Sequence, residues 1–266
     1  MKQSILNRLP PEHPWGQRVL TFDCIDSTNT RARELAKTGA PSGTVLIADR
    51  QTGGRGRLGR SFHSPAGVGV YLSVILRPRC KATELMHLTC AAAVAAREAV
   101  ENTCGLRCGI KWTNDLVYGT KKLGGILTEL GLCPDGTADY AIIGIGINCC
   151  HRREDFPEEL QDMAASLSMV TGREVDCSLL AANLISALHT MDRTLLSGRE
   201  EMMELYRSRC ITLGREISLV RADGAVRHGR ALTVDPDGAL VVQFADGTTE
   251  AVSSGEVSVR GMYGYI

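Results

Sequence analysis

The pattern of the sequence changes at about residue 213, and this change constrains the fold more than any other feature. Before it, long apolar runs alternate with segments of helical periodicity. After it, short alternating segments are separated by three dipeptides typical of hairpin turns, Asp223-Gly224, Asp237-Gly238 and Asp246-Gly247. A chain of 266 residues with 44% hydrophobic content can bury a sizeable core. We therefore predict two domains, residues 1–212 and residues 213–266, the second a small SH3-like β-barrel.

The first predicted domain mixes strands with helices. Strands are predicted over residues 21–25, 43–48, 68–76 and 140–148, a hairpin over 109–118 and 121–130, and helices over 83–104, 178–197 and 200–209. A further helix follows the capping residues 26–29 and ends near Gly39. Ser178 is the predicted cap of the helix that Gly198 ends. The fold class is α+β, with helices packed on a mixed sheet.

The charge balance excludes a general attraction to polyanions. Thirty basic residues are matched by thirty acidic ones, so no overall field draws nucleic acid or an anionic membrane to the chain. Residues 1–20 contain three prolines where a signal peptide needs an apolar stretch, and no run approaches the ~18 apolar residues of a membrane helix. We expect a cytoplasmic protein that does not associate with membranes.

The ten cysteines do not follow a metal-binding or disulfide pattern. None forms Cys-x-x-Cys, and the cluster Cys149-Cys150-His151 has no second pair at ligand spacing. Four cysteines stand among apolar residues and are predicted to be reduced core side chains, namely Cys24, Cys90, Cys177 and Cys210. We therefore predict no metal site.

A glycine-rich basic loop, residues 53–60, lies between two predicted strands. Residues 50–83 hold seven basic side chains and no acidic one. Glycines allow a close approach of the backbone, and guanidinium groups bind phosphate or carboxylate, so the loop suits an anion. The alternative is a solvated basic turn. The spacing Gly54-x-Gly56-x-x-Gly59 also matches a dinucleotide fingerprint, but the Pro65 and Gly67 that follow do not open the helix which that fingerprint requires.

Polar residues at three other places are candidate ligand contacts. Residues 27–29 lie at a strand-to-helix turn, where they either contact a polar ligand group or only cap the helix. In the predicted hairpin, Lys111, Asn114 and Asp115 face Lys121 and Lys122 and are expected to converge at one end. The strand 140–148 ends in glycines and a polar amide, where a ligand can approach the backbone.

Together these segments resemble the biotin protein ligases, from about Asp23 to the C-terminus. The matching segments are Ser27-Thr28-Asn29, Gln51-Thr52-Gly53-Gly54-Arg55-Gly56-Arg57-Leu58-Gly59-Arg60, Ser64-Pro65, Lys111-Trp112-Thr113-Asn114-Asp115, Lys122-Leu123-Gly124-Gly125-Ile126-Leu127 and Gly144-Ile145-Gly146-Ile147-Asn148. Thr113 departs from the family, in which proline is commoner. The resemblance implies a ligase that activates biotin with ATP as biotinyl-5'-AMP and transfers it to a lysine of a biotin carboxyl carrier protein or domain. Mg²⁺ would accompany ATP.

The resemblance also implies a set of site residues. Those for biotin are Ser27, Thr28, Asn29, Gln51, Gly54, Arg55, Gly56, Arg57 and Lys122. Those for ATP are Arg55, Arg57, Arg60, Lys111, Asn114, Lys122 and Asn148. The catalytic residues are Arg57, Lys111, Asp115 and Lys122. Asp115 would orient or deprotonate the carrier lysine, unless it is a structural cap.

Two other functions are compatible with some of these segments. A lipoate or octanoate ligase has a related fold, although the Gly-Arg-Gly-Arg loop and the terminal β domain favour the biotin branch. A sensor that binds biotin without catalysis would not need both Lys111 and Lys122. Residues 1–20 do not fit the N-terminal helix-turn-helix domain of some family members, so we expect no sequence-specific DNA binding. Family members often dimerise, and a homodimer is possible here.

Overall fold

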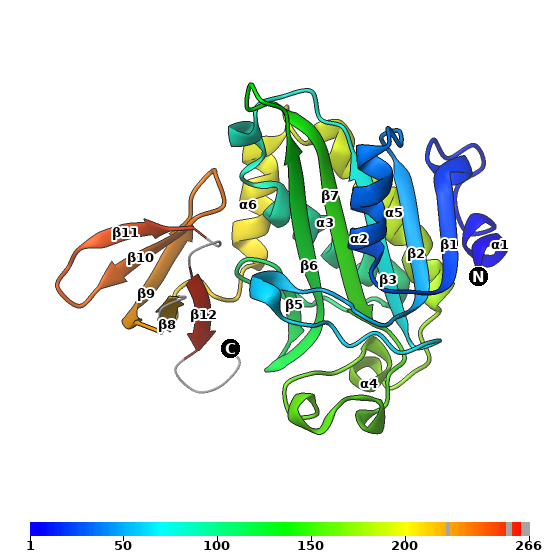
Figure 1. Cartoon of the computed structure of the whole chain (residues 1–266). Coiled ribbons are helices and arrows are strands. Elements are labelled where there is room, and N and C mark those ends of the chain that lie inside the picture. Colours follow the sequence, from blue (N-terminus) through cyan, green and yellow to red (C-terminus); the bar gives the residue numbers. More distant parts are fainter. Residues whose placement is uncertain (222–223, 254–256, 262–266) are drawn as a thin grey trace.

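The computed structural model describes residues 1–221, 224–253 and 257–261 and shows a seven-stranded sheet in the order β1-β2-β3-β7-β6-β5-β4 (Figure 1). Its strands are β1 (Val19–Ile25), β2 (Thr44–Gln51), β3 (Gly69–Leu76), β4 (Gly109–Lys111), β5 (Asp115–Tyr118), β6 (Lys121–Leu132) and β7 (Ala138–Asn148). β1 and β2 are parallel and all other neighbours are antiparallel. The predicted mixed sheet is thereby confirmed.

Helices cover both faces of this sheet. The longer ones are α2 (Thr28–Lys37), α3 (Leu88–Cys104), α5 (Cys177–Thr194) and α6 (Arg199–Arg209). The shorter elements are α1 (Lys2–Leu6), α4 (Leu167–Thr171) and the 3₁₀ turns η1 (Gly16–Arg18), η2 (Arg57–Gly59), η3 (Ala82–Leu85), η4 (Arg153–Asp155) and η5 (Glu158–Leu160). α3 and α5 pack on one face, α6 packs against α3, and α2 lies on the opposite face (Figure 1).

The alternation of side chains along β7 shows how the two faces differ. Ile143, Ile145 and Ile147 point into the large core under α3 and α5. Ile142 belongs to a smaller cluster with Ala32 and other residues under α2. Further along that second face, β7 has glycines at positions 144 and 146. This face is therefore filled by α2 at one end and is open at the other.

Three predicted elements differ from the structure. The helix predicted over residues 83–104 begins at Leu88, because residues 82–85 form the separate 3₁₀ turn η3. Residues 109–118 do not form one strand, because the chain reverses after Lys111 and β4 pairs antiparallel with β5, placing Lys111 opposite Asp115. The hydroxyl of Tyr206 donates to the carbonyl of Thr113 within this reversal, at 3.1 Å. The cap of α5 is Asp176 rather than Ser178, because the Asp176 carboxylate accepts from the backbone N–H groups of residues 178 and 179.

A second, fully antiparallel sheet follows, in the order β11-β10-β9-β8-β12. Its strands are β8 (Glu216–Arg221), β9 (Val226–Val234), β10 (Leu240–Phe244), β11 (Thr249–Val252) and β12 (Val257–Gly261). Gly224, Gly238 and Gly247 have positive φ in the three predicted turns. Asp223 of the first turn lies outside the described residues. Among the described pairings none joins β11 to β12, so closure into a barrel stays a prediction.

The two sheets share one continuous core. Core residues of the second sheet, such as Ile217 and Val242, belong to the same buried cluster as the apolar residues under α3 and α5. Trp112 connects the sheets directly, since its backbone N–H donates to the Thr212 hydroxyl and its indole Nε1–H donates to the Gly238 carbonyl, both at 2.9 Å. The domain limits 1–212 and 213–266 stay a prediction.

All ten cysteines are free thiols. Cys90 and Cys210 are buried as predicted, and Cys177 is half-buried. The prediction was wrong for Cys24, which is exposed, because β1 is the edge strand of the sheet. No helix within the described part of the chain is long and apolar enough to cross a membrane.

Candidate active site

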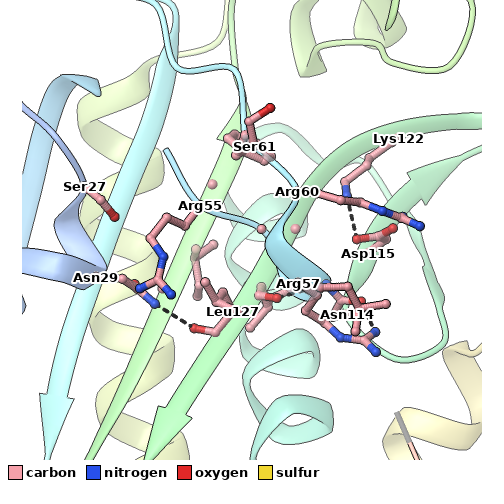
Figure 2. Close-up of a pocket in the computed structure, with 18 of the residues that line it drawn as sticks. Ser27, Asn29, Arg55, Arg57, Arg60, Ser61, Asn114, Asp115, Lys122 and Leu127 are labelled. Carbon is pink, nitrogen blue, oxygen red and sulfur yellow. Dashed lines mark hydrogen bonds and ion pairs between the residues drawn. The ribbon is translucent and has the colours of Figure 1, made fainter. Parts of the chain in front are cut away.

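A pocket occupies the open end of the sheet face that carries α2. Its floor is formed by Gly125 to Leu127 of β6 and Gly144 to Gly146 of β7. The start of α2 borders one side, the glycine-rich loop covers it, and the β4–β5 turn borders the other side. In Figure 2, Asn29, Arg55 and Leu127 lie on one side, and Arg57, Asn114, Asp115 and Lys122 lie on the other. Val259 of β12 also lines the pocket, so the second sheet contributes to its wall.

The α2 side of the pocket is a network of uncharged polar groups. Gln51 Oε1 accepts from the Thr28 N–H at 2.8 Å and from the Thr28 hydroxyl at 3.1 Å. The Ser73 hydroxyl donates to Asn29 Oδ1 at 2.6 Å, and Asn29 Nδ2 donates to the Leu127 carbonyl at 3.2 Å. Ser27 caps α2, accepting from the Thr30 N–H at 3.5 Å. This side therefore presents orientated amides and hydroxyls without a net charge.

Glu129 lies at the edge of this network and was missed by the sequence interpretation. Its carboxylate accepts from Arg55 Nη1 at 3.0 Å, from Asn29 Nδ2 at 2.9 Å and from Arg33 Nη1 at 3.3 Å. The alternation along β6 is a signal that could have identified it, because residues 125, 127 and 129 share one face of the strand. Glu129 thus holds Arg55 at the mouth of the pocket in this structure.

The glycine-rich loop folds back on itself as a narrow turn. The Gly56 N–H donates to the Arg60 carbonyl at 2.7 Å, and Arg55 forms a bridge with Ser61. The chain continues from η2 into extended backbone at Arg60, so no helix begins at Gly59 and the rejection of the dinucleotide fingerprint is confirmed. Arg55, Arg57 and Arg60 all line the pocket.

Arg57 joins the loop to the β4–β5 turn. Its Nη1 donates to Asn114 Oδ1 at 2.8 Å, while Asn114 Nδ2 donates to the Ile126 carbonyl at 2.9 Å. Burial lowers the pKa of the Arg57 guanidinium, and the nearby Asp115 carboxylate opposes that shift. An arginine keeps its proton at any physiological pH, so this is a desolvated permanent cation.

The β4–β5 side is the charged part of the pocket. Lys111, Asn114, Asp115 and Lys122 converge here, as the hairpin pattern predicted. Lys122 Nζ lies 2.7 Å from Asp115 Oδ1 in a partly buried ion pair. Lys121 differs, because its ammonium donates to the Asp162 carbonyl outside the pocket. Among the residues that the structure describes, five cationic side chains and a single carboxylate, Asp115, line the pocket.

Two glycines make room on the floor of the pocket. A Cβ atom on Gly144 would overlap the Asn29 carboxamide, and a Cβ on Gly146 would lie 2.6 Å from Cε1 of Phe62. Real Cβ atoms do not approach neighbours so closely, so both positions exclude a side chain. The glycines at the end of β7 therefore allow the α2 side and the loop to close down onto the sheet.

Twelve of the fourteen site residues predicted from the sequence line this pocket, and Gly54 and Asn148 do not. Gly54 is buried in the base of the loop, where a Cβ would meet the Phe62 carbonyl and the Ser64 hydroxyl. The Asn148 side chain is buried and donates to the Ala165 carbonyl at 3.1 Å. Both residues therefore lie behind the residues that line the pocket. Their roles in ligand binding remain predictions.

The fold and the site define a protein of the Biotin/lipoate A/B protein ligase family, whose family model matches residues 21–148. Residues 212–260 match a second model, the Biotin protein ligase C terminal domain. The chain therefore belongs to the biotin protein ligase family, an enzyme family.

Individual relatives agree with this assignment. The bifunctional ligase/repressor BirA of Bacillus subtilis is 36% identical over 240 residues, which covers 90% of this chain and 73% of the relative. The biotin--[acetyl-CoA-carboxylase] ligase of Paracoccus denitrificans is 30% identical over 240 residues, covering 89% and 98%. Among solved structures, the biotin protein ligase from Aquifex aeolicus in complex with biotin and ATP aligns with a TM-score of 0.78 at 30% identity, covering 91% of this chain and 98% of that one.

Proposed function

We propose that this protein activates biotin with ATP as biotinyl-5'-AMP and transfers biotin to a lysine of a biotin carboxyl carrier protein or domain. The observation that carries the proposal is the division of one pocket into an uncharged polar side and a cationic side. A molecule with a neutral polar head and a carboxylate tail fits that division, provided that its tail meets the phosphates of a nucleotide on the cationic side.

The first step joins two anions, and the cationic side suits this work. The biotin carboxylate attacks the α-phosphorus of ATP, forming a mixed anhydride and releasing pyrophosphate. The cations of this side, Arg57, Arg60, Lys111 and Lys122, would neutralise the reacting groups and the leaving phosphates. Arg55 would contribute from the mouth of the pocket, where Glu129 holds it. Lys122 and Arg57 would contact the carboxylate and the α-phosphate, and Lys111 and Asn114 the nucleotide.

The α2 side would hold the ureido end of biotin. A ureido group has two N–H donors and one carbonyl acceptor, and Thr28, Asn29 and Gln51 together offer both kinds of partner. Ser27 and the backbone at Gly56 complete this wall. Mg²⁺ would arrive with the ATP phosphates, because Asp115, the one lining carboxylate in the described part of the chain, is already paired with Lys122.

In the second step a carrier lysine attacks the anhydride carbonyl and AMP leaves. The attacking amine must be neutral, so a group that accepts its proton or orients it is required. Asp115 is the lining residue with this capacity, and its ion pair with Lys122 holds it beside the reacting end of the pocket. We assign Asp115 this role rather than that of a structural cap.

We propose that residues 1–212 form the catalytic domain and residues 213–266 an SH3-like β domain. The match of residues 212–260 to the C-terminal domain of biotin protein ligases supports this division and favours biotin over lipoate or octanoate. We also propose that the described chain does not bind DNA sequence-specifically.

The test is biotin-dependent exchange of labelled pyrophosphate into ATP, with lipoate and octanoate in parallel reactions. Exchange reports adenylation without the carrier. We expect exchange with biotin alone. Exchange with lipoate or octanoate instead would assign the chain to the sister branch of the family, and biotin binding without any exchange would identify a sensor.

A further inference from the structure

Three thiols meet outside the pocket, where β7 ends and α5 begins. The Sγ atoms of Cys149, Cys150 and Cys177 all lie within 4.8 Å of one another, and Cys150 Sγ lies 3.9 Å from Cys177 Sγ. None of the three residues lines the pocket, and the proposed ligase reaction does not use them. The sequence interpretation saw only the adjacent pair, because Cys177 comes from a distant part of the chain.

Separate backbone contacts hold these thiols together. The N–H groups of Cys149 and Cys150 both donate to the Val68 carbonyl, at 3.1 and 2.7 Å. Cys177 is the first residue of α5, where the cap Asp176 is paired with Arg8 at 2.5 Å. The cluster is therefore positioned by β7, by the chain before β3 and by the start of a helix, and it does not depend on one flexible loop.

The spacing of the sulfur atoms fits thiolates around one ion. Zinc–thiolate bonds of about 2.3 Å in a tetrahedral arrangement place the sulfur atoms roughly 3.8 Å apart. The Cys150 and Cys177 sulfurs, 3.9 Å apart, already have about this separation, and no pair of the three sulfurs is more than 4.8 Å apart. A disulfide would require a sulfur pair to close to about 2.05 Å. The observed geometry is thus nearer to a metal site than to a disulfide.

The surroundings leave room for a fourth ligand from outside the cluster. Cys149 is fully buried, whereas Cys150 and Cys177 are half-buried, so the cluster is open on their side. His151 is the next residue in the chain, but its ring stacks on Phe156 at 4.9 Å and is not part of the ligand group. Three sulfur donors without an oxygen or nitrogen ligand select soft metal ions.

We propose that Cys149, Cys150 and Cys177 form a tri-thiolate site for a thiophilic metal ion of the Zn²⁺ class, with the fourth ligand supplied from solution. The ion would join the end of β7 to the start of α5. β7 also carries the glycines of the pocket floor, so a bound ion would stabilise the strand that forms this floor. The ion itself would not contact substrate. Its loading is independent of the ligase reaction, and so is its test.

The experiment titrates Cd²⁺ into the reduced full-length protein and follows thiolate-to-cadmium charge-transfer absorption, with stoichiometry from native mass spectrometry. We expect one ion per chain, displaced by Zn²⁺, and at least a tenfold loss of affinity in Cys150→Ser and in Cys177→Ser. These half-buried residues are chosen because replacing the fully buried Cys149 would also disturb the packing of the core. The matched control is the double variant Cys24→Ser, Cys133→Ser, which removes two accessible thiols outside the cluster and should bind Cd²⁺ as the unmodified chain does.

Circular dichroism of each variant verifies that the fold is retained. Absence of a charge-transfer band at equimolar Cd²⁺ in the unmodified chain would overturn the proposal. A band that persists in both Cys150→Ser and Cys177→Ser, or that disappears in the control, would assign binding to other thiols and would overturn it as well.

Discussion

Arg57 Nη1 donates to Asn114 Oδ1 at 2.8 Å, and this bond connects the glycine-rich loop to the turn between β4 and β5. The loop covers the pocket and the turn borders one side of it, so the bond fixes the cover to that side. The guanidinium offers five N–H groups in a planar fork, a geometry that suits phosphate or carboxylate oxygens. We therefore propose that Arg57 both binds the adenylate and retains it.

Replacing Arg57 should release the intermediate. Arg57→Ala removes the bond to Asn114 and a charge-assisted contact to phosphate, which is worth roughly 1.5–3 kcal/mol, or about 10- to 150-fold in the rate of adenylate escape. We expect adenylate to form more slowly and to appear free in solution, as measured by rapid gel filtration of labelled biotinyl-5'-AMP. Arg50→Ala is the control, because Arg50 is an exposed cation beyond the pocket. Full retention of adenylate by Arg57→Ala would exclude this role for the loop.

Two neighbouring lysines provide a matched test of the cationic side. Lys122 lines the pocket, whereas Lys121 donates to the Asp162 carbonyl outside it. Lys122→Ala should lower biotin-dependent pyrophosphate exchange by about 10²–10³-fold, because a preorganised group that stabilises developing charge is lost. Lys121→Ala should change exchange less than threefold. Equal effects of the two substitutions would show that only the overall charge matters.

Replacing Asp115 should affect biotin transfer more than biotin adenylation. Asp115→Asn keeps the shape of the side chain but removes its ability to accept a proton. We expect biotin transfer to a carrier domain to fall by about 10²-fold or more, since general-base assistance contributes on that order. Pyrophosphate exchange should fall much less. A structural role predicts the opposite pattern, with equal losses in both assays and a lower melting temperature.

Gly144 tests the floor of the pocket. A methyl group in Gly144→Ala would overlap the Asn29 carboxamide, which is hydrogen-bonded to Ser73 and Leu127. Overpacking of this kind costs about 1–3 kcal/mol, and here it also displaces a proposed biotin contact. We expect a lower melting temperature and a KM for biotin raised tenfold or more. Gly16→Ala is the control, since a Cβ there meets nothing within 4 Å. An unchanged KM in Gly144→Ala would exclude contact between Asn29 and biotin.

His87 makes folding stability depend on pH. The ring is fully buried at the start of α3. Its Nε2 lies 2.9 Å from the Leu195 carbonyl, while Nδ1 has no hydrogen-bond partner among the residues that the structure describes. Burial lowers the pKa of His87; Arg199 also lowers it, and the contact to Leu195 and the Asp237 charge oppose the shift. The unfolded chain takes up a proton near pH 6.5 and the folded chain resists it, so stability is fully present above that pH and decreases as the pH falls.

We expect urea unfolding at pH 7.5 and pH 5.5 to show this loss in the unmodified chain. The loss should be smaller in His87→Gln, which keeps a donor for the Leu195 carbonyl but does not titrate. His228→Gln, at an exposed position in β9, is the control and should keep the full loss. The same dependence on pH in all three proteins would remove His87 from this role.

Local patterns predicted most of the elements because each one carries its own signal. Apolar runs marked β2, β3 and β7, and Gly105 ended α3 in the left-handed conformation, as a C-cap glycine does. The break between β4 and β5 has no such signal. Residues 109–118 have the composition of a strand, and the reversal is supported from outside by Tyr206 and Thr212, which are about a hundred residues away in the chain.

Only the site residues that belong to the family motifs could be predicted from the sequence. The family motifs contain the cations and amides that line the pocket, but Glu129 lies just beyond them, and its role depends on Arg55, Arg33 and Asn29 meeting in space. Cys177 is similar, because its neighbours Cys149 and Cys150 are brought to it by the packing of α5. Local periodicity carries no information about contacts between distant segments, so these contacts could not be predicted.

The shared core between the two sheets changes the meaning of the predicted boundary at residue 213. Trp112 sits between the pocket residues Lys111 and Asn114, and it is held by Thr212 and Gly238. A chain cut at residue 212 would keep every side chain proposed to bind biotin and ATP. However, it would lose Gly238, a hydrogen-bond partner of Trp112, and Val259, which lines the wall of the pocket. We expect such a fragment to contain all the residues proposed to bind biotin and ATP and yet to lack an assembled site.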